Sequence, residues 1–189
     1  MVPSAVINEA IVFFTAIAMW ALVCRTPREK LPESFRYFTV LSNLFCGFTA
    51  LILLISELFG AMPPWAVTLK YMGTAAVTVT LLTVFLYLLP ASRSVQGLLG
   101  NGPEFIMHLI TPVLAILSFL CFEQGDLSAW IIPLGVLPVV IYGWVYLVRV
   151  VIHRTWEDMY GFNRNGQWKL SFSLMTLGAV AVAVLLWAL

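Results

Sequence analysis

Residues able to do nucleophilic chemistry stand in two otherwise apolar stretches of this chain. Residues 35–45 read FRYFTVLSNLF and include Thr39, and residues 104–118 read EFIMHLITPVLAILS and include His108. A hydroxyl and an imidazole can act as nucleophile and base, with the imidazole taking the hydroxyl proton during attack on a carbonyl. The alternative interpretation is structural. A membrane threonine commonly bonds to a carbonyl of its own helix, and a buried histidine can bridge two helices.

Pro112 lies four residues after His108 and lacks the amide hydrogen that would bond the His108 carbonyl in a helix. We therefore expect a polar notch at this turn. Ser42, Asn43 and Thr111 are the candidates for contacts with a substrate there. Asn43 stands one turn deeper than the candidate nucleophile, where its amide could donate to an oxyanion.

The composition places these polar residues in a membrane. The 189 residues are 61% apolar and 10% charged, with a mean hydropathy of +0.97, whereas soluble domains carry about 25% charged residues. The chain has no P-loop, no dinucleotide-binding fingerprint, no HExxH motif and no basic block. We therefore expect a bilayer environment and no nucleic-acid partner.

Six runs are long enough and apolar enough to cross a bilayer, which takes about 20 residues each. Short polar segments separate them, so consecutive helices should be antiparallel neighbours. The sequence predicts an all-α membrane protein with one domain over residues 1–189, a compact bundle of six transmembrane helices. The predicted spans are 4–24, 35–59, 66–90, 104–122, 128–149 and 168–189.

Basic residues predict the orientation of these spans. Nine of the ten Lys and Arg residues flank the first, third and fifth loops, and such loops face the cytoplasm in most membrane proteins. We therefore expect both termini outside, in a multi-pass protein of the cytoplasmic (inner) membrane. Thr39 and His108 then each lie about one turn inside the cytoplasmic end of a span. The nine residues are Arg25, Arg28, Lys30, Arg36, Arg93, Arg149, Arg154, Arg164 and Lys169.

The loop after the fifth span, HRTWEDMYGFNRNGQW, is rich in aromatic and charged residues. Its aromatic residues suit a membrane interface. Alternatively the loop forms a lid, with Trp156, Glu157 and Asp158 as lid residues or as groups that orient His108. A mixed metal site of His108, His153, Glu157 and Asp158 is a further alternative. Because no tight ligand spacing supports that site, we predict neither a metal nor a cofactor.

Lys70 is the tenth basic residue and the only one near the outer end of the bundle. One interpretation is a side chain that reaches the membrane surface and pairs with Glu57. The other is a cation that faces a ligand, with Thr74 and Thr78 following on the same helix face. The sequence leaves both interpretations open.

The stretches FRYFTVLSNL and MHLITPVLAIL resemble the androgen-induced family of six-span membrane proteins, in particular its prokaryotic branch. The segment TWEDMYGFN is similar in position to an aromatic segment of that family. Its animal members hydrolyse fatty acid esters of hydroxy fatty acids with an intramembrane threonine and histidine. The resemblance therefore implies that Thr39 is the nucleophile and His108 the base.

These observations lead us to expect an integral membrane lipid ester hydrolase that acts on fatty-acyl esters, such as fatty acid esters of hydroxy fatty acids. Such an enzyme needs no cofactor. The alternative is a membrane carrier or lipid-binding protein without catalysis, which would use the same polar notch to hold a lipid.

Overall fold

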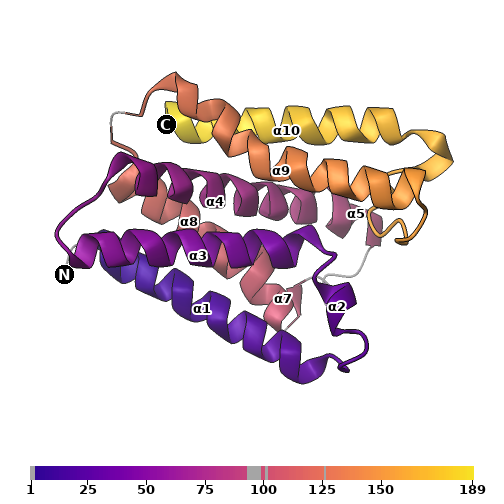
Figure 1. Cartoon of the computed structure of the whole chain (residues 1–189), viewed down its shortest axis with the longest axis horizontal. Helices are drawn as coiled ribbons and strands as arrows, with labels where there is room; N and C mark the ends of the chain where they lie inside the picture. The colour runs from indigo at the N-terminus through magenta and orange to yellow at the C-terminus, as the bar shows by residue number, and fades with distance from the viewer. Residues whose placement is uncertain (1–2, 93–98, 101, 126) are drawn as a thin grey trace.

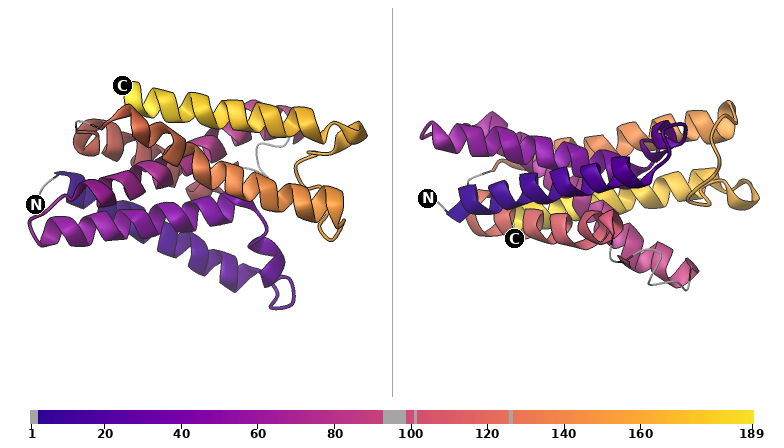
Figure 2. Two further views of the ribbon diagram at one scale, coloured as in Figure 1. Left: turned by 45° about the horizontal axis from the view of Figure 1, so that its top comes forward. Right: turned by 90° about the horizontal axis from the view of Figure 1, so that it is seen from below.

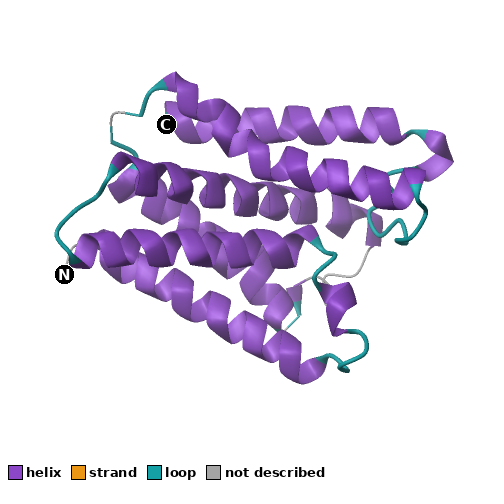
Figure 3. Cartoon of the chain, viewed as in Figure 1, coloured by secondary structure: helices purple, strands orange, loops and turns teal. Residues whose placement is uncertain are grey.

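The computed structural model describes residues 3–92, 99–100, 102–125 and 127–189. Helices dominate these residues, and no strand occurs among them (Figure 3). Arg93, which the sequence analysis assigned to the third loop, lies outside the described residues.

Six helices are long and apolar enough to cross a membrane, and they form a compact bundle, as predicted. The chain is therefore a multi-pass membrane protein. The helix ends differ from the predicted ones by at most three residues, because the apolar runs that fix them are uninterrupted in the sequence. The spans are Pro3–Arg25, Phe38–Leu58, Pro64–Leu88, Pro103–Glu123, Ala129–Ile152 and Trp168–Ala188.

Three spans are single α-helices and three contain turns with other hydrogen bonding. The single helices are α1 (Pro3–Arg25), α3 (Phe38–Leu58) and α10 (Trp168–Ala188). The third span is α4 (Pro64–Thr83) with the π-turn η1 (Val84–Leu88), followed by α5 (Leu89–Ser92). The fourth is α7 (Pro103–Phe105), the π-turn η2 (Ile106–Ile110), α8 (Thr111–Ser118) and the π-turn η3 (Phe119–Glu123). The fifth span consists of the 3₁₀ turn η4 (Ala129–Ile131), α9 (Ile132–Leu147) and the π-turn η5 (Val148–Ile152). Two short elements lie in loops, namely α2 (Leu31–Ser34) and η6 (Arg164–Gly166).

Helix α4 lies at the centre of the bundle and packs against α3, α8, α9 and α10 (Figures 1 and 2). Small residues allow this close packing. A Cβ at Gly73 would lie 2.3 Å from Thr49 Oγ1 and 3.1 Å from Cys46 Cα, so α3 and α4 can approach each other here only because residue 73 is glycine. Large apolar side chains such as Trp20 and Phe48 are exposed on the outside of the bundle instead, where lipid would cover them.

Both chain termini lie at the same end of the bundle, as an even number of spans requires (Figure 1). We call this the terminal end, and we call the opposite end the basic end, because the loops 26–37 and 153–167 with their Lys and Arg residues lie there. Helices α3 and α7 both start at the basic end. Thr39 is the second residue of its span and His108 the sixth, so both lie in the half of the bundle next to the basic end.

Candidate functional site

Thr39 lies in the first turn of α3 and is buried, with 9% of its surface exposed. Several deeper hydroxyls in the bundle bond to carbonyls of their own helix, as Thr78 does with Thr74 at 2.7 Å. Because α3 begins at Phe38, no preceding turn of this helix offers Thr39 such an acceptor. The position of Thr39 therefore disfavours the interpretation that its hydroxyl bonds back to its own helix.

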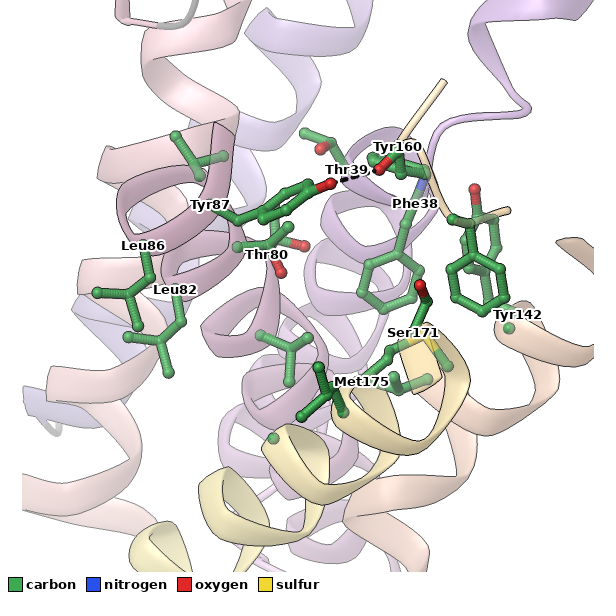
Figure 4. A pocket seen from close by; sticks show the side chains of 18 of the residues that line it. Phe38, Thr39, Thr80, Leu82, Leu86, Tyr87, Tyr142, Tyr160, Ser171 and Met175 are labelled. Atoms are coloured by element: carbon green, nitrogen blue, oxygen red, sulfur yellow. Dashed lines mark hydrogen bonds between the residues drawn. The ribbon is translucent and has the colours of Figure 1, made fainter. Parts of the chain in front are cut away.

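Thr39 lines a cavity of about 630 Å³, a volume within the range of small-molecule sites. The cavity runs between α3, α4, η1, α9 and α10, and the loop 153–167 covers part of it (Figure 4). Thr39, Thr80, Thr83 and Ser171 supply aliphatic hydroxyls to a lining that is otherwise mostly apolar and aromatic. Gly178 also lines the cavity, ten residues into α10 and thus about 15 Å along that helix. The shape suits a hydrocarbon chain with a polar group near Thr39.

Two side chains hold the carbonyl of Thr39. Ser42 Oγ donates to it at 3.1 Å and Asn43 Nδ2 donates to it at 2.8 Å. Ser42 Oγ also shares a hydrogen bond of 2.8 Å with Thr80 Oγ1, which ties this turn to α4. Ser42 and Asn43 therefore fix the backbone of the turn that carries Thr39.

Asn43 also connects this turn to the segment that carries His108. The Thr111 N–H bonds to the Ile106 carbonyl in the π-turn, so the Met107 carbonyl loses its usual helical donor. Asn43 Nδ2 donates to that carbonyl at 3.0 Å. The missing N–H of Pro112 predicts a polar notch at this turn. In the π-turn pattern residue 112 would serve the Met107 carbonyl, and because it is a proline, Asn43 on α3 satisfies that carbonyl instead.

These contacts change the role expected of Asn43. A side-chain amide has two N–H donors, and here they serve the carbonyls of Thr39 and Met107. Donation from Asn43 to an oxyanion would break one of these bonds. Asn43 is therefore a positioning residue in this structure, because it holds two helices together beside Thr39.

His108 is buried in the π-turn η2, with 7% of its surface exposed. It lies next to Met107, so the Asn43 bridge brings its segment against the Thr39 turn. His108 is not among the residues that line the 630 Å³ cavity. Thr111 is fully buried, and its hydroxyl has no hydrogen-bond partner within the described part of the chain. The pairing of Thr39 with His108 therefore stays a prediction.

The loop 153–167 is fastened over the basic end by tyrosines. Tyr160 accepts the Phe38 N–H on its hydroxyl oxygen at 3.0 Å, and its own carbonyl accepts the Tyr87 hydroxyl at 3.0 Å (Figure 4). Asp158 organises the loop itself, because its carboxylate accepts the Tyr146 hydroxyl at 3.1 Å and the Phe162 N–H at 2.7 Å. The loop thus lies where a lid would lie, and Asp158 serves its internal structure.

The other residues proposed for the loop have surface contacts. The Arg36 guanidinium lies 5.8 Å from the ring centre of Trp156, which packs edge-on against Tyr146. Glu157 is exposed. No group of three or more His, Cys, Asp and Glu side chains that could hold a metal occurs among the described residues. The structure therefore offers no support for the alternative metal site.

Lys70 is fully buried, so the interpretation that its side chain reaches the membrane surface is wrong. Its ammonium lies 3.6 Å from Glu123 Oε2 and donates to Asn8 Oδ1. Glu123 Oε1 accepts from Asn8 Nδ2 at 2.6 Å, Ser4 Oγ at 2.9 Å and Ser118 Oγ at 2.5 Å.

The partner predicted for Lys70 was also wrong. The carboxylate of Glu57 makes no hydrogen bond within the described residues, whereas Glu123 pairs with Lys70. The predicted fourth span ended at residue 122, but the π-turn η3 carries Glu123 into the bundle. Asn8 and Glu123 were visible in the sequence as lone polar residues beside apolar runs, and this signal could have identified the cluster.

Tyr160 is the residue near Thr39 that sequence reasoning did not select, because an aromatic residue in an interfacial loop has an ordinary explanation. Its contact with the start of α3 joins residues 122 positions apart. No local pattern in the sequence marks such a contact.

Comparison of the chain with protein-family models, with curated proteins and with solved structures gave no match.

Proposed function

We propose that this protein is an integral membrane lipid ester hydrolase in which Thr39 is the nucleophile and His108 the general base. One observation carries the proposal: a buried hydroxyl in the first turn of a helix lines a largely apolar cavity of about 630 Å³. An acyl chain fits such a lining, and its ester group would then lie beside Thr39. The substrates are fatty-acyl esters, among which the resemblance implies fatty acid esters of hydroxy fatty acids.

The proposed reaction has two halves. The Thr39 oxygen bonds to the ester carbonyl carbon, His108 takes the hydroxyl proton, and the same proton leaves with the departing alcohol. Water then attacks the acyl-threonine, gives a proton to His108 and releases the fatty acid, and the proton returns to Thr39. One ester and one water thus give one acid and one alcohol. The Asn43 bridge supports the pairing, because it holds the two reacting segments against each other.

The cavity gives the proposal its test. Gly178 lines the cavity, and a Cβ there would meet no atom within 4 Å. Gly178→Phe should therefore fill the space for the acyl chain without distorting α10. We expect the purified variant to lose most hydrolysis of para-nitrophenyl palmitate and to keep hydrolysis of para-nitrophenyl butyrate, whose chain ends short of residue 178.

Leu177→Phe is the matched control for this experiment. Leu177 is the neighbouring residue, is 64% exposed and does not line the cavity, so the same ring added there should leave both rates unchanged. Equal loss of palmitate and butyrate hydrolysis in Gly178→Phe would contradict the placement of the acyl chain.

The basic end is proposed to face the cytoplasm, in the cytoplasmic membrane, because most basic residues flank it. The ester would then be cleaved near the cytoplasmic headgroups. A reporter that is active only outside the cytoplasm, fused after Leu189, should be active, and one fused within the loop 153–167 should be inactive. The opposite pattern would reverse the orientation and place Thr39 at the outer surface.

A carrier or lipid-binding protein is the second candidate function. It is favoured by one observation, namely that His108 is not among the residues lining the cavity that Thr39 lines. A binding protein would take up the same acyl chain without turnover. Wild-type protein that binds a long-chain ester but releases no alcohol from it would establish this candidate in place of the hydrolase.

A further inference from the structure

The proposed reaction needs a hydrogen-bond donor for its oxyanion, and Asn43 cannot supply one without losing a structural bond. Its two amide hydrogens serve the carbonyls of Thr39 and Met107. Acyl-transfer sites depend on donors that are aimed in advance at the oxygen where negative charge develops. Such a donor must lie at the end of the cavity where Thr39 lies.

Tyr160 is fixed at that end by contacts on several sides. Its hydroxyl oxygen accepts the Phe38 N–H at 3.0 Å, its backbone N–H donates to the Tyr146 hydroxyl at 3.2 Å, and its carbonyl accepts the Tyr87 hydroxyl at 3.0 Å. The rings of Tyr146 and Tyr160 lie 5.4 Å apart. Since Phe38 precedes Thr39 in the chain, the phenol is anchored to the turn that carries the nucleophile.

The Phe38 N–H occupies one lone pair of the Tyr160 oxygen, so the hydroxyl hydrogen is directed away from Phe38. The same hydroxyl also has a hydrogen bond with the Tyr142 hydroxyl. Thr39, Tyr142 and Tyr160 all line the cavity (Figure 4). A carbonyl group held beside Thr39 can therefore take the Tyr160 hydrogen in exchange for the Tyr142 contact. Burial raises the pKa of the Tyr160 phenol, and hydrogen bonds from the Phe38 N–H, the Tyr142 hydroxyl and the Thr39 N–H oppose this effect only in part. The phenol therefore keeps its proton at neutral pH.

We propose that Tyr160 is a catalytic residue of the hydrolase proposed above, on which this inference rests, and that its O–H donates a hydrogen bond to the carbonyl oxygen of a fatty-acyl ester. This bond strengthens when the Thr39 oxygen joins the carbonyl carbon and the carbonyl oxygen becomes negative. No proton leaves Tyr160, since the proton of Thr39 passes through His108 to the alcohol. The start of α3 adds the positive end of a helix dipole at the same place.

Tyr160→Phe tests the proposal, since it removes the donor and keeps the ring. With para-nitrophenyl butyrate we expect kcat to fall by about 10²–10³-fold, the usual cost of one oxyanion donor, with little change in KM. Tyr37→Phe is the control, because Tyr37 precedes the same helix, is 42% exposed and does not line the cavity. A kcat of Tyr160→Phe within a few-fold of wild type would overturn the proposal.

Tyr160 also caps the Phe38 N–H, so a second measurement has to separate this structural role from catalysis. Meta-fluorotyrosine at position 160 keeps the ring and the hydroxyl but lowers the phenol pKa. A phenolate cannot donate a hydrogen bond, so kcat should fall at high pH as the phenol ionises. This fall should move to lower pH when residue 160 is meta-fluorotyrosine, and it should stay in place when residue 37 is. An unmoved alkaline limb would overturn the proposal. The other titratable groups near the phenol are Tyr37, Tyr142, Tyr146 and Asp158.

Two variants distinguish a failed role for Tyr160 from a failed hydrolase. If Thr39→Val is inactive while Tyr160→Phe is nearly as fast as wild type, the hydrolase stands and the donor assignment fails. If Thr39→Val retains the wild-type rate, the hydrolase proposal itself fails, and the role of Tyr160 fails with it.

Discussion

Thr39→Val should abolish ester hydrolysis, with a fall in kcat of at least about 10³-fold, because valine keeps the branched shape of threonine and removes its nucleophilic oxygen. Thr39→Ser should retain measurable activity, since it keeps a hydroxyl at the same position. The measurement is alcohol release from para-nitrophenyl butyrate by purified protein. A long-chain fluorophosphonate should label wild-type Thr39 and leave the valine variant unlabelled.

His108→Ala tests the proposed general base in the same assay. His108→Ala should cost about as much as Thr39→Val, and the double variant little more than either, because the two residues act on one proton. The rate should also fall as the pH is lowered, since a protonated imidazole cannot accept a proton. Two separate losses that multiply in the double variant would contradict a single nucleophile–base unit. The thermal midpoint of each variant shows whether the bundle stays folded.

Glu123→Gln should destabilise the bundle by about 3–5 kcal/mol, the typical effect of leaving one charge of a buried pair without its partner. The pair is fully enclosed, since the side chains of Lys70 and Glu123 have no exposed surface and their charged atoms lie 3.6 Å apart. Lys70→Met should have an effect of similar size. The measurement is the shift of the thermal unfolding midpoint of the protein in detergent.

The double variant of Lys70→Met with Glu123→Gln should be more stable than the sum of the two single effects, because it leaves no unpaired charge. Glutamine keeps an oxygen that can accept the hydroxyls of Ser4 and Ser118. Glu33→Gln is the control, since Glu33 pairs with Arg36 at the exposed basic end and such pairs contribute at most about 1 kcal/mol. Single variants that unfold at the wild-type temperature would show that the buried pair does not stabilise the bundle.

The sequence by itself determined which segments cross the membrane. Hydropathy is a local property, so runs such as Phe38–Leu58 and Pro103–Glu123 could be located within three residues. The position of Thr39 and of His108 within these runs placed both residues near the same end of the bundle, since depth in a helix increases by about 1.5 Å per residue. The fixed order of antiparallel spans then put both termini at one end.

The tertiary structure alone decided which of these residues meet. Position along the sequence had suggested Glu57 as the partner of Lys70, but the structure pairs Lys70 with Glu123. The π-turn η3 contains one more residue per turn than an α-helix, and it rotates the end of the fourth span so that Glu123 faces the bundle. Asn43 serves two carbonyls because another π-turn releases the one at Met107. Tyr160 reaches the start of α3 only through the folded loop. Each contact joins segments far apart in the chain. The first two depend on local departures from the regular helix and the third on the path of a loop, and hydropathy encodes neither.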